Sequence, residues 1–349
     1  MRKFSNVSQG LPVLLFLIGL LGCNQSTDQH TASSDVVSKQ VTLEEVDRIA
    51  LKGVDTVIGY VSGVSFGQDR FLIWDNMYSQ SCLLFDMEGH LLKTVGKRGQ
   101  GPGEHSIING ACISNDRIHL VSTNARHNIY SIDGIFEISL PKPFKGSCNS
   151  VVCDEDGGAY LLSLSQYSPS TIYHTNDKGE LLNSFSPPER DVPTLYDAFY
   201  PQSSLLVDDS VIFQAFNYSN HILKFDKSGN QTDTIVLESP SFILPDHDLA
   251  RKVHGLKQEK HFRSTFTQLC GIYSLDNAYV TRLRIWDTPE SGKDLLEFWS
   301  TDFLYVGEFT VCDDELFVGT HEGLLVFARL NPDSTYLIFR KRSHSKDSY

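Results

Sequence analysis

The residues of this chain that could do chemistry are few, and no recognised catalytic motif joins them. Metal-assisted hydrolases and lyases hold their ion with convergent His, Asp or Glu ligands, and the candidates here are His105, His127, His321 and Glu322. The chain has neither a Gly-x-Ser-x-Gly elbow nor a His-Glu-x-x-His motif. The segment Gly96–Glu104 is glycine-rich but lacks the Lys-Ser/Thr of a phosphate-binding loop. We therefore expect no metal and no cofactor, and keep a metal-dependent hydrolase or lyase as the alternative.

A larger set of residues suits binding better than catalysis. Aromatic rings stack on sugars and on peptide side chains, and Arg and Asn supply directed hydrogen-bond donors. The residues that we predict to bind a ligand are Arg98, Glu104, His105, Arg126, His127, Tyr167, Tyr196, Tyr200, Tyr218, Trp286, His321 and Glu322.

Short apolar segments that recur along the chain must position these side chains. The clearest unit runs from Phe71 to Gly96 and contains three strand-like pieces separated by turn residues. Its hairpin signature, an apolar strand ending in an acidic residue shortly before Gly, recurs with aspartates at Asp86, Asp133, Asp177 and Asp226, which are 47, 44 and 49 residues apart. Two blurred units follow. A period of about 40–50 residues built from several strands is typical of propeller blades. The sequence thus predicts an all-β, six-bladed β-propeller of four-stranded antiparallel blades.

A propeller sorts its loops onto two faces. Strands a to d of each blade run from the axis to the rim, so the a–b and c–d turns share one face, while the b–c loops and blade-to-blade connections share the other. We predict that the first face carries short acidic turns that are simply solvated, including Asn115-Asp116, Asp154–Asp156, Asp208-Asp209 and Asp313–Glu315. The second face is predicted to carry the binding residues, with His321-Glu322 placed in one of its b–c loops.

Two long insertions also fall on the second face. They span Pro187–Gln202, with Tyr196 and Tyr200, and roughly Glu238–Thr267. Long loops in compact domains are usually functional or disordered. Leu249, Val253 and Leu256 recur at helical spacing, which predicts a short helical insertion between blades 4 and 5.

The N-terminus has the pattern of an export signal. Arg2 and Lys3 precede an apolar run, and Leu20-Leu-Gly-Cys23 is similar to a bacterial lipobox, in which the thiol of Cys23 is lipidated. We predict a lipoprotein signal peptide at 1–22, a lipidated Cys and flexible tether at 23–43, and the propeller at 44–349. The alternative, an ordinary signal peptide with a Cys at its end by chance, remains open. Loss of residues 1–22 takes the formal net charge from −13 to −15, which argues against nucleic-acid binding.

Six cysteines follow Cys23. Cys112, Cys153, Cys270 and Cys312 each precede an acidic turn, on what should be the innermost strand of a blade, where space near the axis favours small residues. We interpret these four as small buried hydrophobes, although an exported protein could pair cysteines as disulfides.

The first unit with its exit loop, Phe71–Glu104, resembles an NHL-type repeat, and in particular the six-bladed β-propeller lipoproteins of Gram-negative envelopes. Trp74-Asp75, Phe85-Asp86-x-x-Gly89 and Gly99–Glu104 carry this likeness, and elsewhere in residues 45–340 only the period and the turns match. The resemblance implies the fold and a cell-envelope location. Such propellers include both binding modules and enzymes, so the fold does not choose between them.

Taken together, the sequence favours a lipid-anchored envelope protein, with the outer membrane preferred, that binds a glycan, a peptide or a protein partner without catalysis. We expect a monomer whose only membrane contact is the lipid. A purely structural subunit is a third hypothesis. Val46–Leu51 is predicted to add a strand to the last blade and to close the ring.

Overall fold

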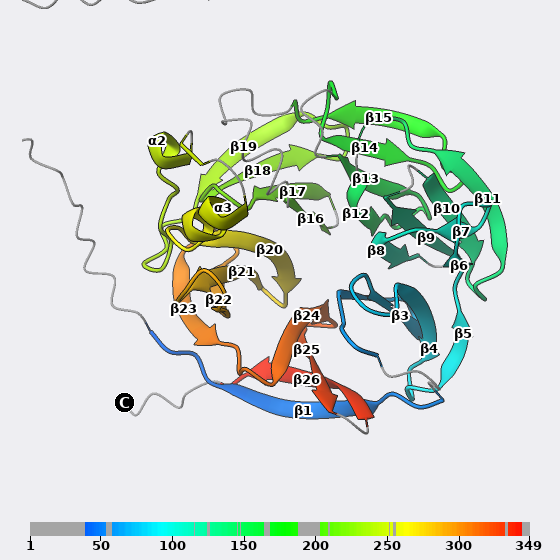
Figure 1. The fold of residues 1–349 in the computed structure, drawn as a ribbon, viewed down its shortest axis with the longest axis horizontal. Coiled ribbons are helices and arrows are strands. Elements are labelled where there is room, and N and C mark those ends of the chain that lie inside the picture. Colours follow the sequence, from blue (N-terminus) through cyan, green and yellow to red (C-terminus); the bar gives the residue numbers. More distant parts are fainter. Residues whose placement is uncertain are drawn as a thin grey trace, which may run out of the picture. The chain divides into compact units, whose positions relative to one another are not determined.

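The computed structural model describes residues 39–53, 58–114, 116–123, 126–144, 146, 148–163, 168–187, 203–208, 210–250, 252–253, 256–331 and 334–343. The part of the chain from residue 37 onward forms one compact unit. It consists of six four-stranded antiparallel sheets arranged around an axis, which confirms the predicted six-bladed propeller (Figure 1). No helix in the described residues is both long and apolar enough to cross a membrane.

In each blade the first strand named is the innermost and the last is the outermost. Blade 1 contains β2 (Gly63–Phe66), β3 (Arg70–Asp75), β4 (Ser81–Asp86) and β5 (Leu91–Thr94). Blade 2 contains β8 (Ile108–Ile113), β9 (Arg117–Ser122), β10 (Arg126–Ser131) and β11 (Phe136–Pro141). Blade 3 contains β12 (Cys148–Cys153), β13 (Ala159–Ser163), β14 (Ile172–Thr175) and β15 (Leu181–Phe185). Blade 4 contains β16 (Ser203–Asp208), β17 (Val211–Phe216), β18 (His221–Asp226) and β19 (Gln231–Val236).

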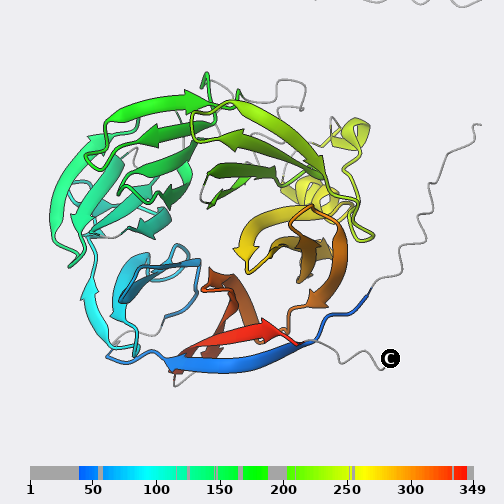
Figure 2. The same cartoon turned by 180° about the vertical axis from the view of Figure 1, so that it is seen from behind.

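Blade 5 contains β20 (Gln268–Leu275), β21 (Ala278–Trp286), β22 (Gly292–Ser300) and β23 (Tyr305–Thr310). Blade 6 is built from both ends of the propeller. Its inner strands are β24 (Glu315–His321), β25 (Leu324–Asn331) and β26 (Ser334–Arg342), and its outermost strand is β1 (Leu43–Ala50). β1 pairs antiparallel with β26, with Leu43 opposite Arg342 and Ala50 opposite Tyr336. The predicted ring closure is confirmed, and Figure 2 shows β1 lying along the outer edge of β26.

The blades are apolar on both faces, and each face packs against a neighbouring blade. Along β3, Phe71 and Ile73 belong to a buried cluster that includes Leu337 of blade 6. Leu72, which points to the opposite face because side chains alternate along a strand, belongs to a cluster with Leu120 of blade 2. Burial of each fully enclosed Leu, Ile or Phe contributes about 1.5–3 kcal/mol, so these interfaces form the core.

The predicted hairpin turns join the two outer strands of blades 1 to 4. Their glycines, Gly89, Gly134, Gly179 and Gly229, have φ angles of 81°, 70°, 77° and 85°, a region that other residues rarely adopt. In blade 1, Asp86 Oδ1 accepts hydrogen bonds from the amides of Glu88 and His90 at 3.1 and 2.8 Å. The aspartate therefore fixes the turn that the glycine permits.

Blade 6 differs from the prediction by one strand. Glu322 and Gly323 form its a–b turn, between β24 and β25, so His321 and Glu322 lie on the face of the short turns and not on the second face. Asp313 and Asp314 belong instead to the connection from blade 5 to blade 6, and Glu315 begins β24. The assignment was wrong because β1 supplies the outermost strand of this blade from the other end of the sequence. Each of the three strands near the C-terminus therefore lies one position closer to the axis than predicted.

The predicted helical insertion lies between blades 4 and 5. It forms two short helices, α2 (His247–Ala250) and α3 (Leu256–Arg263), instead of one (Figure 1). Ala250, Val253, Phe262 and Phe266 form a small buried cluster of their own, against which Tyr218 packs. The insertion is therefore a packed element of the second face.

The cysteine prediction is wrong for one pair and for one single residue. Cys112 on β8 and Cys153 on β12 form a disulfide, with Cα atoms 5.6 Å apart, between the innermost strands of blades 2 and 3. Cys270 lies on an innermost strand with a free thiol, as expected, but it is only partly buried, and Cys312 is exposed in a connection. The inner strands of adjacent blades approach closely enough near the axis for thiols on neighbouring blades to meet.

We predict that β1 is required for a stable ring. A protein that begins at residue 53 should lose at least about 3 kcal/mol of unfolding free energy, because Leu43, Ile49 and Leu51 no longer cover the apolar cores beside blade 6. A protein that begins at residue 39 keeps β1 and is the matched control. Equal urea midpoints for the two proteins would show that β1 does not close the ring.

We predict that the Cys112–Cys153 disulfide also stabilises the propeller. The bridge closes a loop with a sequence separation of 41 residues, for which the chain-entropy model gives up to about 4 kcal/mol. Replacing both residues with Ser should lower the urea midpoint, and a reductant should then have no further effect. Cys312→Ser is the control for loss of an exposed thiol. A wild-type midpoint unchanged by reductant would contradict this prediction.

Candidate functional site

The second face has a rigid element between blades 1 and 2, which we call the clip. It consists of β6 (Lys97–Arg98) paired in parallel with β7 (Glu104–His105), and the glycine-rich loop connects them. Glu104 holds the loop closed, because its carboxylate accepts a hydrogen bond from the Gly101 amide at 2.8 Å and pairs with Lys97 Nζ at 3.0 Å. The Gly101 amide and, after it, Lys97 lower the pKa of Glu104. Glu104 is thus a structural residue of the clip.

The clip is anchored to blade 2. Asn128 donates through Nδ2 to the carbonyl of Glu104 at 3.0 Å, and the Tyr130 hydroxyl donates to the carbonyl of Gly103 at 3.0 Å. His105 is 1% exposed, and neither of its ring nitrogens has a hydrogen-bond partner among the described residues. Burial lowers the pKa of His105. It therefore lies beneath the clip as a buried, neutral side chain.

Arg98 lines a pocket on this face, which we call the Arg98 pocket. Its volume is about 290 Å³, and it is lined by Gln80, Arg98, Gly99, Gln100, Ser106, Ile107 and Thr123. The Ser106 and Thr123 hydroxyls lie 2.6 Å apart and connect the clip to the b–c loop of blade 2. Among the described residues, Arg98 has no hydrogen-bond or ion-pair partner, so its guanidinium is available. Sequence reasoning found Arg98 but missed Gln80, Ser106 and Thr123, whose side chains carry no distinguishing pattern.

The b–c loop of blade 1 forms another wall of this region. Asp75 is 2% exposed, and its carboxylate accepts amide hydrogen bonds from Met77, Tyr78 and Ser79 at 2.8–2.9 Å. The Trp74-Asp75 motif therefore fixes a loop. That loop holds Tyr78, whose side chain is 71% exposed, and it ends at Gln80 of the Arg98 pocket. Tyr78 is an aromatic platform that the sequence analysis did not single out.

His127 is buried between blades 2 and 3, where it pairs with His119. His119 Nε2 lies 3.0 Å from the carbonyl oxygen of Gly157, and His119 Nδ1 lies 2.9 Å from His127 Nε2. Because a carbonyl can only accept, His119 carries its proton on Nε2 and His127 donates to its Nδ1. Burial, first of all, lowers the pKa of both rings. His127 thus packs between blades 2 and 3 and is buried away from the surface.

Three other predicted residues are spread over the second face. Arg126 begins β10 and donates to the Ser139 hydroxyl at 3.2 Å. Tyr218 follows β17 and packs against the helical insertion. Trp286 ends β21, with the guanidinium of Arg284 5.4 Å from its ring centre. Each lies in a different blade, and none lines the Arg98 pocket.

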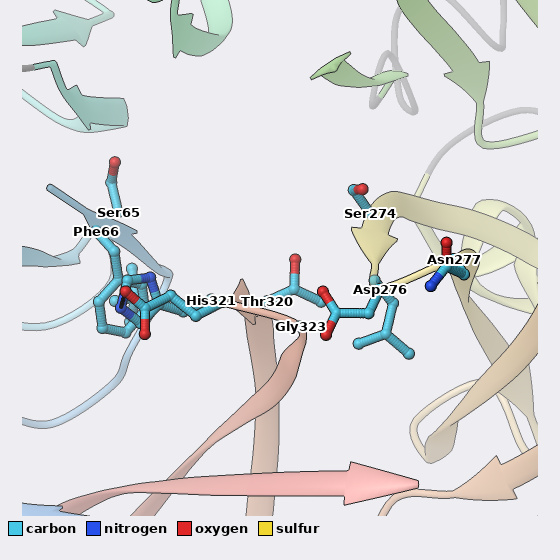
Figure 3. A pocket seen from close by; sticks show the side chains of 11 residues that line it. Ser65, Phe66, Ser274, Asp276, Asn277, Thr320, His321 and Gly323 are labelled. Carbon is cyan, nitrogen blue, oxygen red and sulfur yellow. Dashed lines mark ion pairs between the residues drawn. The ribbon is translucent and has the colours of Figure 1, made fainter. Parts of the chain in front are cut away.

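His321 and Glu322 line a cavity on the opposite face, which we call the axial cavity (Figure 3). Its volume is about 580 Å³, and it lies where the inner strands of blades 1, 5 and 6 end. The lining residues are Val64, Ser65, Phe66, Ser274, Leu275, Asp276, Asn277, Thr320, His321, Glu322 and Gly323. His321 stacks on Phe66 with ring centres 4.1 Å apart, and burial lowers its pKa. The face that was predicted to carry only solvated turns therefore contains a cavity.

The structure does not bring the predicted metal ligands together. His321 lies in the axial cavity, whereas His105 and His127 lie in the clip and the blade 2–3 interface. In the described residues, no three His, Cys, Asp or Glu side chains are grouped so that they could hold a metal ion. Tyr167, Tyr196, Tyr200 and the lipidation residue Cys23 lie outside the described residues.

We predict that the histidine pair makes the propeller less stable in acid. The native pKa of His127 is lower than its unfolded value near 6.5, so the unfolded state binds more protons as the pH falls below 6.5. Stability is therefore lost from pH 6.5 downward, by about 2 kcal/mol for His127 between pH 6.5 and 5. His127→Gln keeps a donor toward His119 and should remove that loss, measured by urea unfolding at both pH values. If the unfolding free energy falls between pH 6.5 and pH 5 by the same amount in His127→Gln as in wild type, His127 does not bind an extra proton on unfolding.

Comparisons with known proteins agree with this architecture. A profile of the DUF5128 family, described as a 6-bladed beta-propeller, matches residues 29–262. A crystal structure of a "Putative exported protein" from Bacteroides fragilis NCTC 9343 has a TM-score of 0.66 at 12% identity, covering 88% of this chain and 98% of that one. A DUF4221 family member from Bacteroides vulgatus ATCC 8482 has a TM-score of 0.64 at 12% identity, covering 88% and 100%.

Likeness at this level of identity shows the fold alone. No curated protein matches the sequence. The matched residues of the family profile include β1, blades 1 to 4 and α2, which is more than half of the chain. The chain therefore belongs to the DUF5128 family of six-bladed β-propellers.

Proposed function

We propose that this protein is an exported, non-catalytic binding module that takes a glycan or a peptide through its second face. The observation that carries the proposal is the Arg98 pocket. It presents an unpaired guanidinium on the clip, and the clip is held by Glu104 and anchored to blade 2. A preorganised surface loses little conformational entropy on binding.

The chemistry of the pocket suits a ligand rich in hydroxyl or carbonyl groups. Arg98 can donate up to five hydrogen bonds, the amides of Gln80 and Gln100 can both donate and accept, and Ser106 and Thr123 add hydroxyls. Tyr78 in the adjoining loop offers an exposed ring for stacking. Arg126, Tyr218 and Trp286 on the same face, with Tyr167, Tyr196 and Tyr200, would extend the contact for a longer glycan, a peptide or a protein partner.

Export and lipid anchoring are part of the same proposal. The signal pattern at 1–22 and the lipobox-like Leu20–Cys23 support a lipoprotein of the cell envelope, in the outer membrane, with residues 23–43 as its tether. The name of the Bacteroides fragilis neighbour describes that protein as exported. The likeness of blade 1 to NHL-type repeats is consistent with this location. We propose a monomer that contacts the membrane only through the lipid and does not bind nucleic acid.

The competing hypothesis is a metal-dependent hydrolase or lyase. It requires ligands from several blades to converge, whereas the candidate ligands His105, His127 and His321 lie in three separate places. Elemental analysis of residues 24–349, with thermal unfolding before and after a chelator, separates the two hypotheses. A stoichiometric metal whose removal lowers the melting temperature would favour the enzyme hypothesis over the binding-module hypothesis.

We predict that Arg98 is required for ligand capture. Residues 24–349 would be applied to arrays of glycans and of short peptides, and the dissociation constant of the strongest hit would be measured for wild type and Arg98→Ala. Loss of charged hydrogen bonds should weaken binding by about tenfold or more. Lys178→Ala removes the same charge from an exposed hairpin on the opposite face and should bind normally. Equal binding by Arg98→Ala would place the site elsewhere.

A further inference from the structure

We propose that the axial cavity is a second ligand site, and that it takes a small organic cation bearing an ammonium or guanidinium group. The cavity lies on the face opposite the Arg98 pocket, so the inference does not rest on the proposed function. Its volume of about 580 Å³ falls within the usual range of about 300–1,000 Å³ for small-molecule sites.

Contacts within and between blades hold the walls of the cavity in place. The stacked rings of Phe66 and His321 form one wall, and Phe66 is supported from behind by Phe71 and Phe339 at 5.5 and 5.9 Å. On the other side, Ser274 donates to Asp208 at 3.4 Å, which ties the end of β20 to blade 4. Thr320 carries its hydroxyl toward the space between these walls (Figure 3). Ser65 Oγ accepts a hydrogen bond from the amide of Ile113 in blade 2 at 3.1 Å.

Charge decides the class of ligand. Asp276 and Glu322 are the acidic residues of the lining, and the lining contains no Lys or Arg. Asp276 has no hydrogen-bond or ion-pair partner among the described residues. Glu322 has only His321 at 3.9 Å, which burial keeps neutral. An anion would meet two uncompensated carboxylates, whereas a cation would neutralise them, and the formal net charge of −13 attracts cations from a distance.

Asp276 and Glu322 contrast with the acidic residues in two other turns of this face. An acidic residue occurs in the a–b turn of every blade, at Asp69, Asp116, Asp154, Asp208, Asp276 and Glu322. Asp69 pairs with Arg70 at 2.8 Å, and Asp154 pairs with His174 at 2.6 Å. Those two carboxylates are satisfied within the protein. At the axial cavity the same position is left open, next to hydroxyls and the amide of Asn277 that can accept from an N–H group.

Gly323 makes room for this arrangement. Its φ of 72° places it in the left-handed region, and a Cβ there would collide with the carboxylate of Asp276. The turn of blade 6 therefore lies close against a carboxylate of blade 5 at the rim of the cavity, and only glycine leaves room for it.

Calorimetric titration of residues 24–349 tests the proposal with matched pairs of probes. The cations are cadaverine, glucosamine and an N-acetylated trilysine amide, which distinguish a free amine, an amino sugar and a peptide side chain. The neutral counterparts are, in the same order, 1,5-pentanediol, N-acetylglucosamine and the same peptide with acetylated lysines. We expect saturable one-to-one binding by at least one cation and none by its neutral counterpart.

The variants locate the binding. Asp276→Asn should weaken it about fivefold, the loss expected for one partly exposed ion pair, and Asp276→Asn with Glu322→Gln should abolish it. Asp302→Asn removes an exposed carboxylate from a c–d turn of the same face and should have no effect. Arg98→Ala should also bind cations normally. A failure of the axial-cavity proposal can therefore be distinguished from a failure of the proposed function, which depends on Arg98. If Asp276→Asn does not fold, Thr320→Lys, which places an ammonium in the cavity, should block binding.

Three results would overturn the proposal. One is the absence of saturable binding by every cation. Another is equal binding of the neutral counterparts, which would mean that charge does not select the ligand. The third is an equal loss in Asp302→Asn and Asp276→Asn, which would mean that cations bind the acidic surface at large.

Discussion

Burial of both faces of every blade is the constraint on which the rest of this structure depends. Phe71 and Leu72 are neighbours on β3, yet one packs toward blade 6 and the other toward blade 2. A sheet that is apolar on both sides cannot end in solvent, so the blades must continue around the axis until the last covers the first. The strands then form a rigid scaffold, and irregular segments are confined to its two faces.

The parts of the fold that depend on local chemistry could be predicted from the sequence. The turn of Asp86 and Gly89 uses a side-chain cap and a positive φ, and both can be recognised from a few residues. Blade 6 could not be predicted correctly, because its outermost strand comes from the far end of the chain. The bridge between Cys112 and Cys153 likewise depends on how closely two inner strands approach, which no local pattern records.

For the candidate sites, the residue types could be read from the sequence, but the neighbours and burial of each side chain could not. The guanidinium of Arg98 has no partner among the described residues. The carboxylate of Glu104, six residues further along the chain, holds the clip closed. Burial can also reverse the expected behaviour of a charged residue. Glu297 lies opposite Glu308 across β22 and β23 with no described cation beside it, and burial raises its pKa to about 7. Such an environment is set by tertiary packing alone.

The pairing of β1 with β26 has a consequence for how the chain reaches its folded state. β1 is synthesised before every other strand of the propeller, but Leu43 cannot meet Arg342 until the last strand is available. Joining ends roughly 300 residues apart costs about 5 kcal/mol of chain entropy. Throughout synthesis, the apolar sides of blades 1 and 6 that face each other stay uncovered. A chain released before β26 (Ser334–Arg342) is synthesised would therefore keep an open edge, however complete its other blades.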